Sequence, residues 1–179
     1  MITSDQAILV IVDVQGKLAQ LMADKTSLFE NLQRMIKGFN ALDLPIILLE
    51  QVPDKLGPTI SEIGTLLPDL TPIEKSSFSC MGCDDFKAVL ESSGRKHVVL
   101  VGIEAHICVY QSAAQLLDAG YEVSVISDAV SSRTVENRNI GIQQMNQLGA
   151  KISSVEMLLF ELLQHAKAPA FRDIATIVK

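Results

Sequence analysis

Three residues of different chemical type each stand near the end of a predicted strand, and Cys108 is the most informative of them. An apolar run from Val98 to Ile103 predicts a strand that is buried on both faces of a sheet. After it, apolar residues recur every three or four positions as far as Asp118, which predicts a helix. A thiol in the first turn of a helix meets unpaired N–H groups and the positive end of the dipole, and both favour the thiolate. Cys108 is therefore a candidate nucleophile; the alternative is a small buried apolar residue.

Asp13 and Lys75 are candidates for the groups that would assist such a thiol. Asp13 follows the apolar run Ala7–Val12, where it could be a general base that takes the proton of Cys108, or simply the cap of the next helix. Lys75 could hold Asp13 by charge and favour both the carboxylate and the thiolate. The alternative for Lys75 is a solvated surface lysine.

The remaining thiols and histidines support other chemistry less well. Cys80 and Cys83 form a Cys-x-x-Cys pair, which could serve a thiol redox or peroxide-sensing role, although no clear buried strand precedes them. The three histidines lack the spacing of a zinc finger, so no metal site is expected. His106 could contact a substrate or cap the helix, but a dyad with Cys108 is not expected because side chains two residues apart on a helix diverge. No glycine-rich nucleotide motif follows any strand, so we expect no cofactor.

The elements that must position these residues alternate between strand and helix. Strands are predicted at Ala7–Val12, Pro45–Leu49, within Thr71–Ser79, and at Val98–Ile103, Glu122–Ile126 and Lys151–Ser154. Helices are predicted at Ser27–Leu42 (with Ser27 and Glu30 as a capping box), Thr59–Leu67, Asp84–Ser92, after Cys108, and at Glu136–Leu148, Val155–His165 and Pro169–Val178. This alternation predicts right-handed crossovers and a Rossmann-like α/β fold, in which helices cover both faces of a six-stranded parallel sheet as three layers.

The predicted sheet brings the three candidate residues together. If the strand order is 3-2-1-4-5-6, the first and fourth strands are neighbours where the winding reverses. Asp13 and Cys108 follow the carboxyl ends of those two strands, and Lys75 could reach the same edge from the third strand. A nucleophile, a base and a cation would then converge from distant parts of the chain.

Composition narrows the classes of function and partner. The chain has 179 residues, 48% of them hydrophobic, and a formal net charge of −6, so we expect one domain over residues 1–179 and no nucleic-acid surface. No apolar segment is long enough to span a membrane, and three cysteines leave one unpaired in any disulfide scheme; we expect a cytoplasmic protein with a small-molecule substrate and no membrane partner. A homo-oligomer, a dimer or larger, is expected because the predicted helix 155–165 has more apolar residues than one packing face requires. The alternative is that the chain itself covers this helix on both sides. The apolar residues are Met157, Leu158, Leu159, Phe160, Leu162 and Leu163.

Motifs along nearly the whole chain resemble the isochorismatase-like cysteine hydrolase superfamily. They are Ile11–Gln15, Glu74–Phe78, Gly102–Val109, Ser127–Arg133 and Ser154–Glu161. The resemblance implies the sheet order given above and places the catalytic Asp, Lys and Cys of the family on Asp13, Lys75 and Cys108. It also implies a cis peptide between Ile103 and Glu104 and an oxyanion hole at the start of the Cys108 helix, formed around Ile103, Glu104, Ile107 and Cys108.

Two departures from the family pattern narrow the activity that the resemblance implies. True isochorismatases have glycine where Cys108 stands, so vinyl-ether hydrolysis is not the first expectation. Nicotinamidases have an Asp-x-His metal motif where this chain has Glu50-Gln51-Val52-Pro53, so the chain resembles the metal-independent branch.

We therefore predict a cysteine hydrolase that cleaves a small amide or related C–N bond through a thioester, with Gln15, Gln51, Phe78 and Glu104 in the substrate pocket. The alternatives are a catalytically vestigial binding or assembly protein of the same fold and a redox sensor that uses Cys80 and Cys83.

Overall fold

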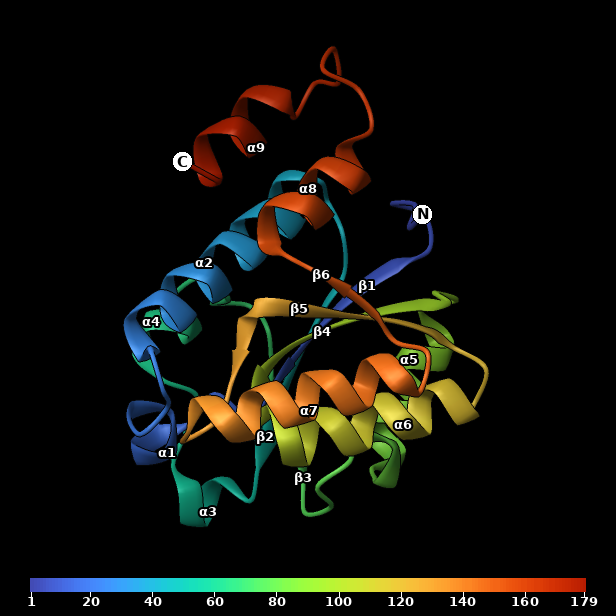
Figure 1. Ribbon diagram of the computed structural model, residues 1–179. Helices are drawn as coiled ribbons and strands as arrows, with labels where there is room; N and C mark the ends of the chain where they lie inside the picture. The colour runs from blue at the N-terminus through green and yellow to red at the C-terminus, as the bar shows by residue number, and fades with distance from the viewer.

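The sheet is the centre of the computed structural model, which describes residues 1–179 (Figure 1). Its six parallel strands lie in the order β3-β2-β1-β4-β5-β6, as predicted. The strands are β1 (Ala7–Val12), β2 (Ile46–Gln51), β3 (Ile73–Lys75), β4 (His97–Ile103), β5 (Glu122–Ser131) and β6 (Lys151–Ser153). Every residue of β1 and β4 is buried, as expected for central strands with helices on both faces.

Helices cover both faces and complete the three layers. They are α1 (Gly16–Gln20), α2 (Lys25–Ala41), α3 (Pro53–Leu56), α4 (Ser61–Gly64), α5 (Asp84–Ser92), α6 (Tyr110–Asp118), α7 (Val135–Gln147), α8 (Val155–Leu163) and α9 (Phe171–Ile177). Two short helical turns precede α5 and α6, the 3₁₀ turn η1 (Cys80–Gly82) and the π turn η2 (Ala105–Val109). None of the helices is long and apolar enough to span a bilayer.

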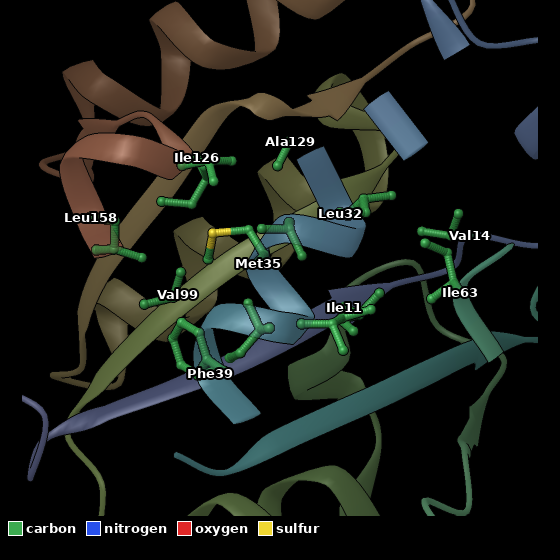
Figure 2. Packing of buried hydrophobic residues seen from close by; sticks show 14 of the residues in the cluster. Ile11, Val14, Leu32, Met35, Phe39, Ile63, Val99, Ile126, Ala129 and Leu158 are labelled. Atoms are coloured by element: carbon green, nitrogen blue, oxygen red, sulfur yellow. The ribbon is translucent and has the colours of Figure 1, made fainter. Parts of the chain in front are cut away.

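Alternation along the strands divides the core into two clusters. Leu9 and Ile11 of β1 point to the face covered by α2 and α8, where they pack with residues such as Met35 and Leu158 (Figure 2). Ile8, Val10 and Val12 point to the opposite face and pack with the buried side chains of α5, α6 and α7. The middle strands are therefore fixed from both sides, and so are the residues that follow their carboxyl ends.

Several predicted boundaries were wrong, and each error has a local cause. Ser27 and Glu30 form no capping box, because α2 already begins at Lys25, after Asp24 with a left-handed backbone. β2 continues to Gln51 and β5 to Ser131, beyond the apolar runs that suggested their ends, because both are paired with neighbouring strands. The helix predicted after β4 begins instead as the separate turn η2.

The helix α8 buries most of the apolar residues that suggested an oligomer. Leu158, Leu159, Leu162 and Leu163 belong to the core cluster on the α2 face, whereas Met157 and Phe160 are exposed. The chain thus covers α8 on much of its surface by itself, and the homo-oligomer stays a prediction.

Candidate functional site

Asp13, Lys75 and Cys108 meet at the carboxyl edge of the sheet. Asp13 follows β1, Lys75 is the last residue of β3, and Cys108 lies in η2 just after β4. The Lys75 Nζ is 2.6 Å from Oδ2 of Asp13, so the lysine side chain crosses the end of the intervening strand β2. The three residues come together only through the strand order, since they are far apart in the sequence.

The Lys75 ammonium is held in one place by four oxygen atoms. Besides Asp13 Oδ2, it donates to Oε1 of Gln51 at 2.6 Å and to the carbonyl oxygens of Ser77 at 3.2 Å and Phe78 at 3.1 Å. An ammonium has three protons and no acceptor, so this set of partners suits a fixed positive charge. Lys75 is therefore a buried counter-ion for Asp13 and not a surface lysine.

One oxygen of Asp13 is left without a partner. The Asp13 side chain is buried, and its Oδ1 atom makes no hydrogen bond although Oδ2 is paired with Lys75. Burial raises the pKa of Asp13, and the Lys75 charge opposes that rise. A raised pKa makes the carboxylate a stronger base, and the unpartnered oxygen is the atom that can accept a proton.

The thiol of Cys108 does not have the lowered pKa that its place at a helix start suggested. Burial, and after it the negative charge of Asp13, raises the pKa of Cys108 to about 12. The Lys75 charge and the backbone N–H of Glu104 act in the opposite direction but are outweighed. The resting form is therefore the thiol, and its proton must leave as the sulfur reacts.

Two glycines set the close packing around these residues. Gly102 in β4 has a φ of 110°, and a Cβ added to it would lie 2.2 Å from the carbonyl oxygen of Val12. Gly141 in α7 packs on η2 so closely that a Cβ would lie 2.7 Å from the carbonyl oxygen of Ala105. The first contact holds the strand before Asp13 against the strand before Cys108, and the second holds the turn that carries Cys108.

The turn η2 corrects one part of the predicted oxyanion hole. The Ile107 N–H donates to the carbonyl oxygen of Glu104 at 3.1 Å, so it is not free for a substrate oxygen. The Val109 N–H donates to the same carbonyl at 3.2 Å, which is the wide spacing of a π turn. The peptide bond between Ile103 and Glu104 is cis.

A cavity of about 100 Å³ opens beside the thiol. Its lining residues are Asp13, Leu18, Gln51, Leu56, Phe78, Ile103, Glu104, Ile107 and Cys108. Three of the four predicted pocket residues, Gln51, Phe78 and Glu104, are among them. Most of the lining is apolar, and Phe78 is itself an exposed side chain.

Gln15, the fourth predicted pocket residue, is not part of the lining. It is fully buried, and its Nε2 donates to the carbonyl oxygens of Gln51 at 3.2 Å and Gly57 at 2.7 Å. Its Oε1 accepts from the backbone N–H of Gln51 at 2.6 Å. With all of these groups engaged by backbone, Gln15 ties the loop before α4 to the end of β2.

Sequence reasoning missed Arg133, Leu18 and Leu56 as site residues. The Arg133 Nε donates to Oε1 of Glu104 at 3.1 Å, which occupies the carboxylate at the pocket wall. Leu18 comes from α1 and Leu56 from α3, two short helices that the apolar pattern did not reveal. Arg133 is the last residue of the motif Ser127–Arg133, and that motif was the signal from which its role could have been predicted.

The other cysteines and His106 lie outside the reacting group. Burial raises the pKa of Cys80 to about 12, and the thiol of Cys83 donates to the carbonyl oxygen of Glu74 at 3.6 Å. No disulfide joins any of the three cysteines. His106 Nδ1 is 2.9 Å from the Ser132 hydroxyl. A buried, protonated thiol such as Cys80 is inert toward oxidants, which argues against a redox pair of Cys80 with the partly exposed Cys83.

The residues at the end of β2 do not fit a metal ion. Both ends of the Gln51 amide are taken, Oε1 by Lys75 and Nε2 by the carbonyl oxygen of Ser76 at 2.9 Å. Glu50 accepts from the N–H and the hydroxyl of Thr59, each at 2.7 Å. No group of three His, Cys, Asp or Glu side chains in the chain could hold a metal ion. The expectation that no metal is needed stays a prediction.

Comparisons with known proteins identify the family and the fold of the chain. The family model for the isochorismatase domain matches residues 7–157. A secreted isochorismatase effector, Isc1, from Phytophthora sojae is 35% identical over 177 residues, which are 97% of this chain and 84% of that protein. Isochorismatase domain-containing protein 2 from Danio rerio is 35% identical over 173 residues, 96% of this chain and 86% of that protein.

Among solved structures, the MAR1 ribonuclease from Caenorhabditis elegans superimposes with a TM-score of 0.92. It is 32% identical and covers 99% of this chain and 91% of that chain. Because one relative is named as secreted, the cytoplasmic location stays a prediction.

Proposed function

This chain belongs to the isochorismatase family, and from that premise we propose that it is a cysteine hydrolase that cleaves the C–N bond of a small amide. The proposal depends on one observation above all: Asp13, whose buried Oδ1 has no hydrogen-bond partner, lines the same small pocket as Cys108. The unpartnered oxygen can accept the thiol proton and later return it, which is the role of a general base and acid.

The first half of the proposed reaction forms a thioester. As the Cys108 sulfur attacks the amide carbon, its proton passes to Asp13 Oδ1 and the carbonyl oxygen becomes an oxyanion. The backbone N–H groups of Glu104 and Cys108 are the proposed donors to that oxyanion, since the N–H of Ile107 is already taken. Collapse of the intermediate breaks the C–N bond, and Asp13 gives its proton to the leaving nitrogen.

The second half removes the acyl group with water. Asp13, again ionised, takes a proton from a water molecule whose oxygen attacks the thioester carbon. Collapse breaks the C–S bond, releases the acid and returns the proton to sulfur. Lys75 keeps Asp13 in place through both halves, because its ammonium is fixed by three further oxygens.

Release of ammonia from a panel of short primary amides tests this proposal. We expect turnover by the wild-type protein, loss of it in Cys108→Ala and in Asp13→Asn, and retention in Cys80→Ala, which removes a buried thiol outside the pocket. If no amide is hydrolysed, or if Cys108→Ala hydrolyses amides as fast as wild type, the vestigial binding protein is the better reading.

RNA is the second substrate to include, because the relative from Caenorhabditis elegans is named a ribonuclease. A pocket of about 100 Å³ is too small for a nucleotide, and a formal net charge of −6 disfavours phosphate chains. We expect no RNA cleavage that depends on Cys108. Cleavage by wild type that is lost in Cys108→Ala would replace the amide proposal.

A further inference from the structure

The pocket beside Cys108 has walls that define what can enter it. We infer that its substrate carries a short, uncharged, aliphatic acyl group, an inference that rests on the proposed function and names the class of amide that the same site would take. Three features of the pocket point to this class: its volume, the fixed position of its walls, and the pairing of each charged side chain of its lining with a charge of opposite sign.

The volume limits the size of the acyl group. The cavity of about 100 Å³ is smaller than the roughly 150 Å³ cavity that is known to take up one benzene molecule. That is room for an acetyl, propionyl or butyryl group and not for an aromatic ring or a sugar. The side chains of Leu18, Leu56, Phe78, Ile103 and Ile107 make the walls apolar, which favours an aliphatic chain.

The wall that carries Leu56 is fixed, so the pocket does not widen easily. A Cβ on Gly16 would lie 2.1 Å from the carbonyl oxygen of Leu56, which means that the backbones are already in contact. Gln15 holds the next carbonyl, that of Gly57, at 2.7 Å. Glu50 holds Thr59 through two hydrogen bonds. These contacts hold the loop after α3, and the two hydrogen bonds between Gln15 and the backbone of Gln51 hold it before α3.

Each charged side chain that lines the pocket is already paired with a charge of opposite sign. Lys75 has four oxygen partners and is fully buried behind Asp13 and Gln51. The two carboxylates of the lining, Asp13 and Glu104, are already paired with Lys75 and Arg133. A substrate carboxylate would face two negative groups without gaining a cation from the lining. A substrate ammonium would lose its hydration in an apolar pocket whose unpartnered anionic oxygen, Asp13 Oδ1, must take the thiol proton.

Alkylation of Cys108 tests, without requiring turnover, whether the pocket prefers an uncharged group to a charged one. Iodoacetamide and iodoacetate differ only by an amide and a carboxylate, and the modified Cys108 peptide can be followed by mass spectrometry. The rate ratio of the two reagents at Cys108 should be about tenfold larger in the folded protein than in the same protein unfolded by guanidinium. An equal ratio in the two states, or a folded Cys108 that reacts with neither reagent, would overturn the inference.

The limit on the size of the acyl group is tested with a bulkier reagent and a matched pair of variants. N-benzyl iodoacetamide should label Cys108 slowly in wild type and about tenfold faster in Leu56→Ala, because one or two methylene groups decide entry into a filled pocket. Leu66→Ala is the control, since Leu66 is also half-buried but lines a separate groove. Equal rates in the two variants would contradict a size limit set by Leu56.

Hydrolysis separates this inference from the proposed function. Propionamide and glycinamide have the same number of non-hydrogen atoms, and we expect kcat/KM to be about tenfold higher for propionamide. If no amide is hydrolysed while the alkylation pattern holds, the proposed function fails and the pocket's preference stands. If glycinamide or malonamate is the better substrate, the preference fails and the hydrolase stands.

Discussion

Cys80 and Cys108 are two buried thiols that titrate alike and differ in what surrounds them. Burial raises the pKa of each to about 12, and the charges of Asp13 and Lys75 act on both. Cys108 borders a cavity that also contains an unpartnered carboxylate oxygen. Cys80 is fully buried, with the Ser112 hydroxyl beside it, and borders no such cavity. Access to a cavity and a nearby base, and not the resting pKa of the thiol, therefore distinguish a nucleophilic cysteine from a cysteine that only packs in the core.

Removing each thiol in turn should give the largest contrast. Cys108→Ala should lower kcat for amide hydrolysis by about 10⁴-fold or more, because no other group can form the thioester. Cys80→Ala should leave kcat within about threefold and lower the free energy of unfolding by about 1 kcal/mol, through loss of a buried sulfur. Ammonia release and urea unfolding measure the two effects. Similar losses of activity in both variants would end the distinction between the thiols.

Removing the base should affect only one of the two thiols. Asp13→Asn keeps the size of the side chain but cannot accept the thiol proton, so kcat should fall by about 10³-fold. The pKa of Cys108 should fall with the loss of the neighbouring negative charge, so alkylation of Cys108 at pH 7 should become faster, whereas Cys80 should stay unlabelled in both proteins. Unchanged labelling of Cys108 in Asp13→Asn would show that the carboxylate does not act on the thiol.

Alkaline pH should reveal what the two thiols share. A folded-state pKa raised from 9.0 to about 12 means that the unfolded chain ionises first, so stability is intact below pH 9 and falls as the pH rises toward 12. Between pH 9 and pH 10 each thiol should remove roughly 1 kcal/mol. Cys80→Ala should therefore lose less stability over this interval than wild type, measured by urea unfolding. An identical loss would mean that Cys80 is not buried as a thiol.

The smallest effect should come from the residue that holds the turn of Cys80. The Cys80 N–H donates to the Ser112 hydroxyl at 2.9 Å, one turn after Cys108 on α6. Ser112→Ala should lower the free energy of unfolding by about 1 kcal/mol, because that buried N–H loses its acceptor. Activity should stay within about threefold of wild type. A larger loss of kcat than of stability would indicate that η1 also positions Cys108.

The fold was predictable from the sequence because its signals are local. Buried strands such as Ala7–Val12 appear as continuous apolar runs, and the alternation with helices fixes a parallel sheet. The meeting of Asp13 and Cys108 followed from strand order. The raised pKa of Cys108 could not be predicted in this way, because it depends on burial and on the carboxylate of Asp13, which follows a different strand.

The remaining site contacts depend on side chains that are distant in sequence. Gln51 meets Lys75 and Arg133 meets Glu104 across 24 and 29 residues, and no periodicity encodes such pairs. The occupied N–H of Ile107 follows from the π turn, which has the same apolar pattern as an α-helix. The apolar pattern predicts which strands are buried, but it does not predict which backbone N–H groups are hydrogen-bonded in the turn that follows.

The backbone contact at Gly102 makes the separation of nucleophile and base a property of the main chain. With 2.2 Å between a Cβ at position 102 and the Val12 carbonyl oxygen, one added methyl group would act as a wedge between the neighbouring strands that precede Cys108 and Asp13. Side-chain changes elsewhere in the pocket can then alter which acyl group is accepted while the reacting pair keeps its spacing. The scaffold thus tolerates drift in substrate preference but not a side chain at position 102.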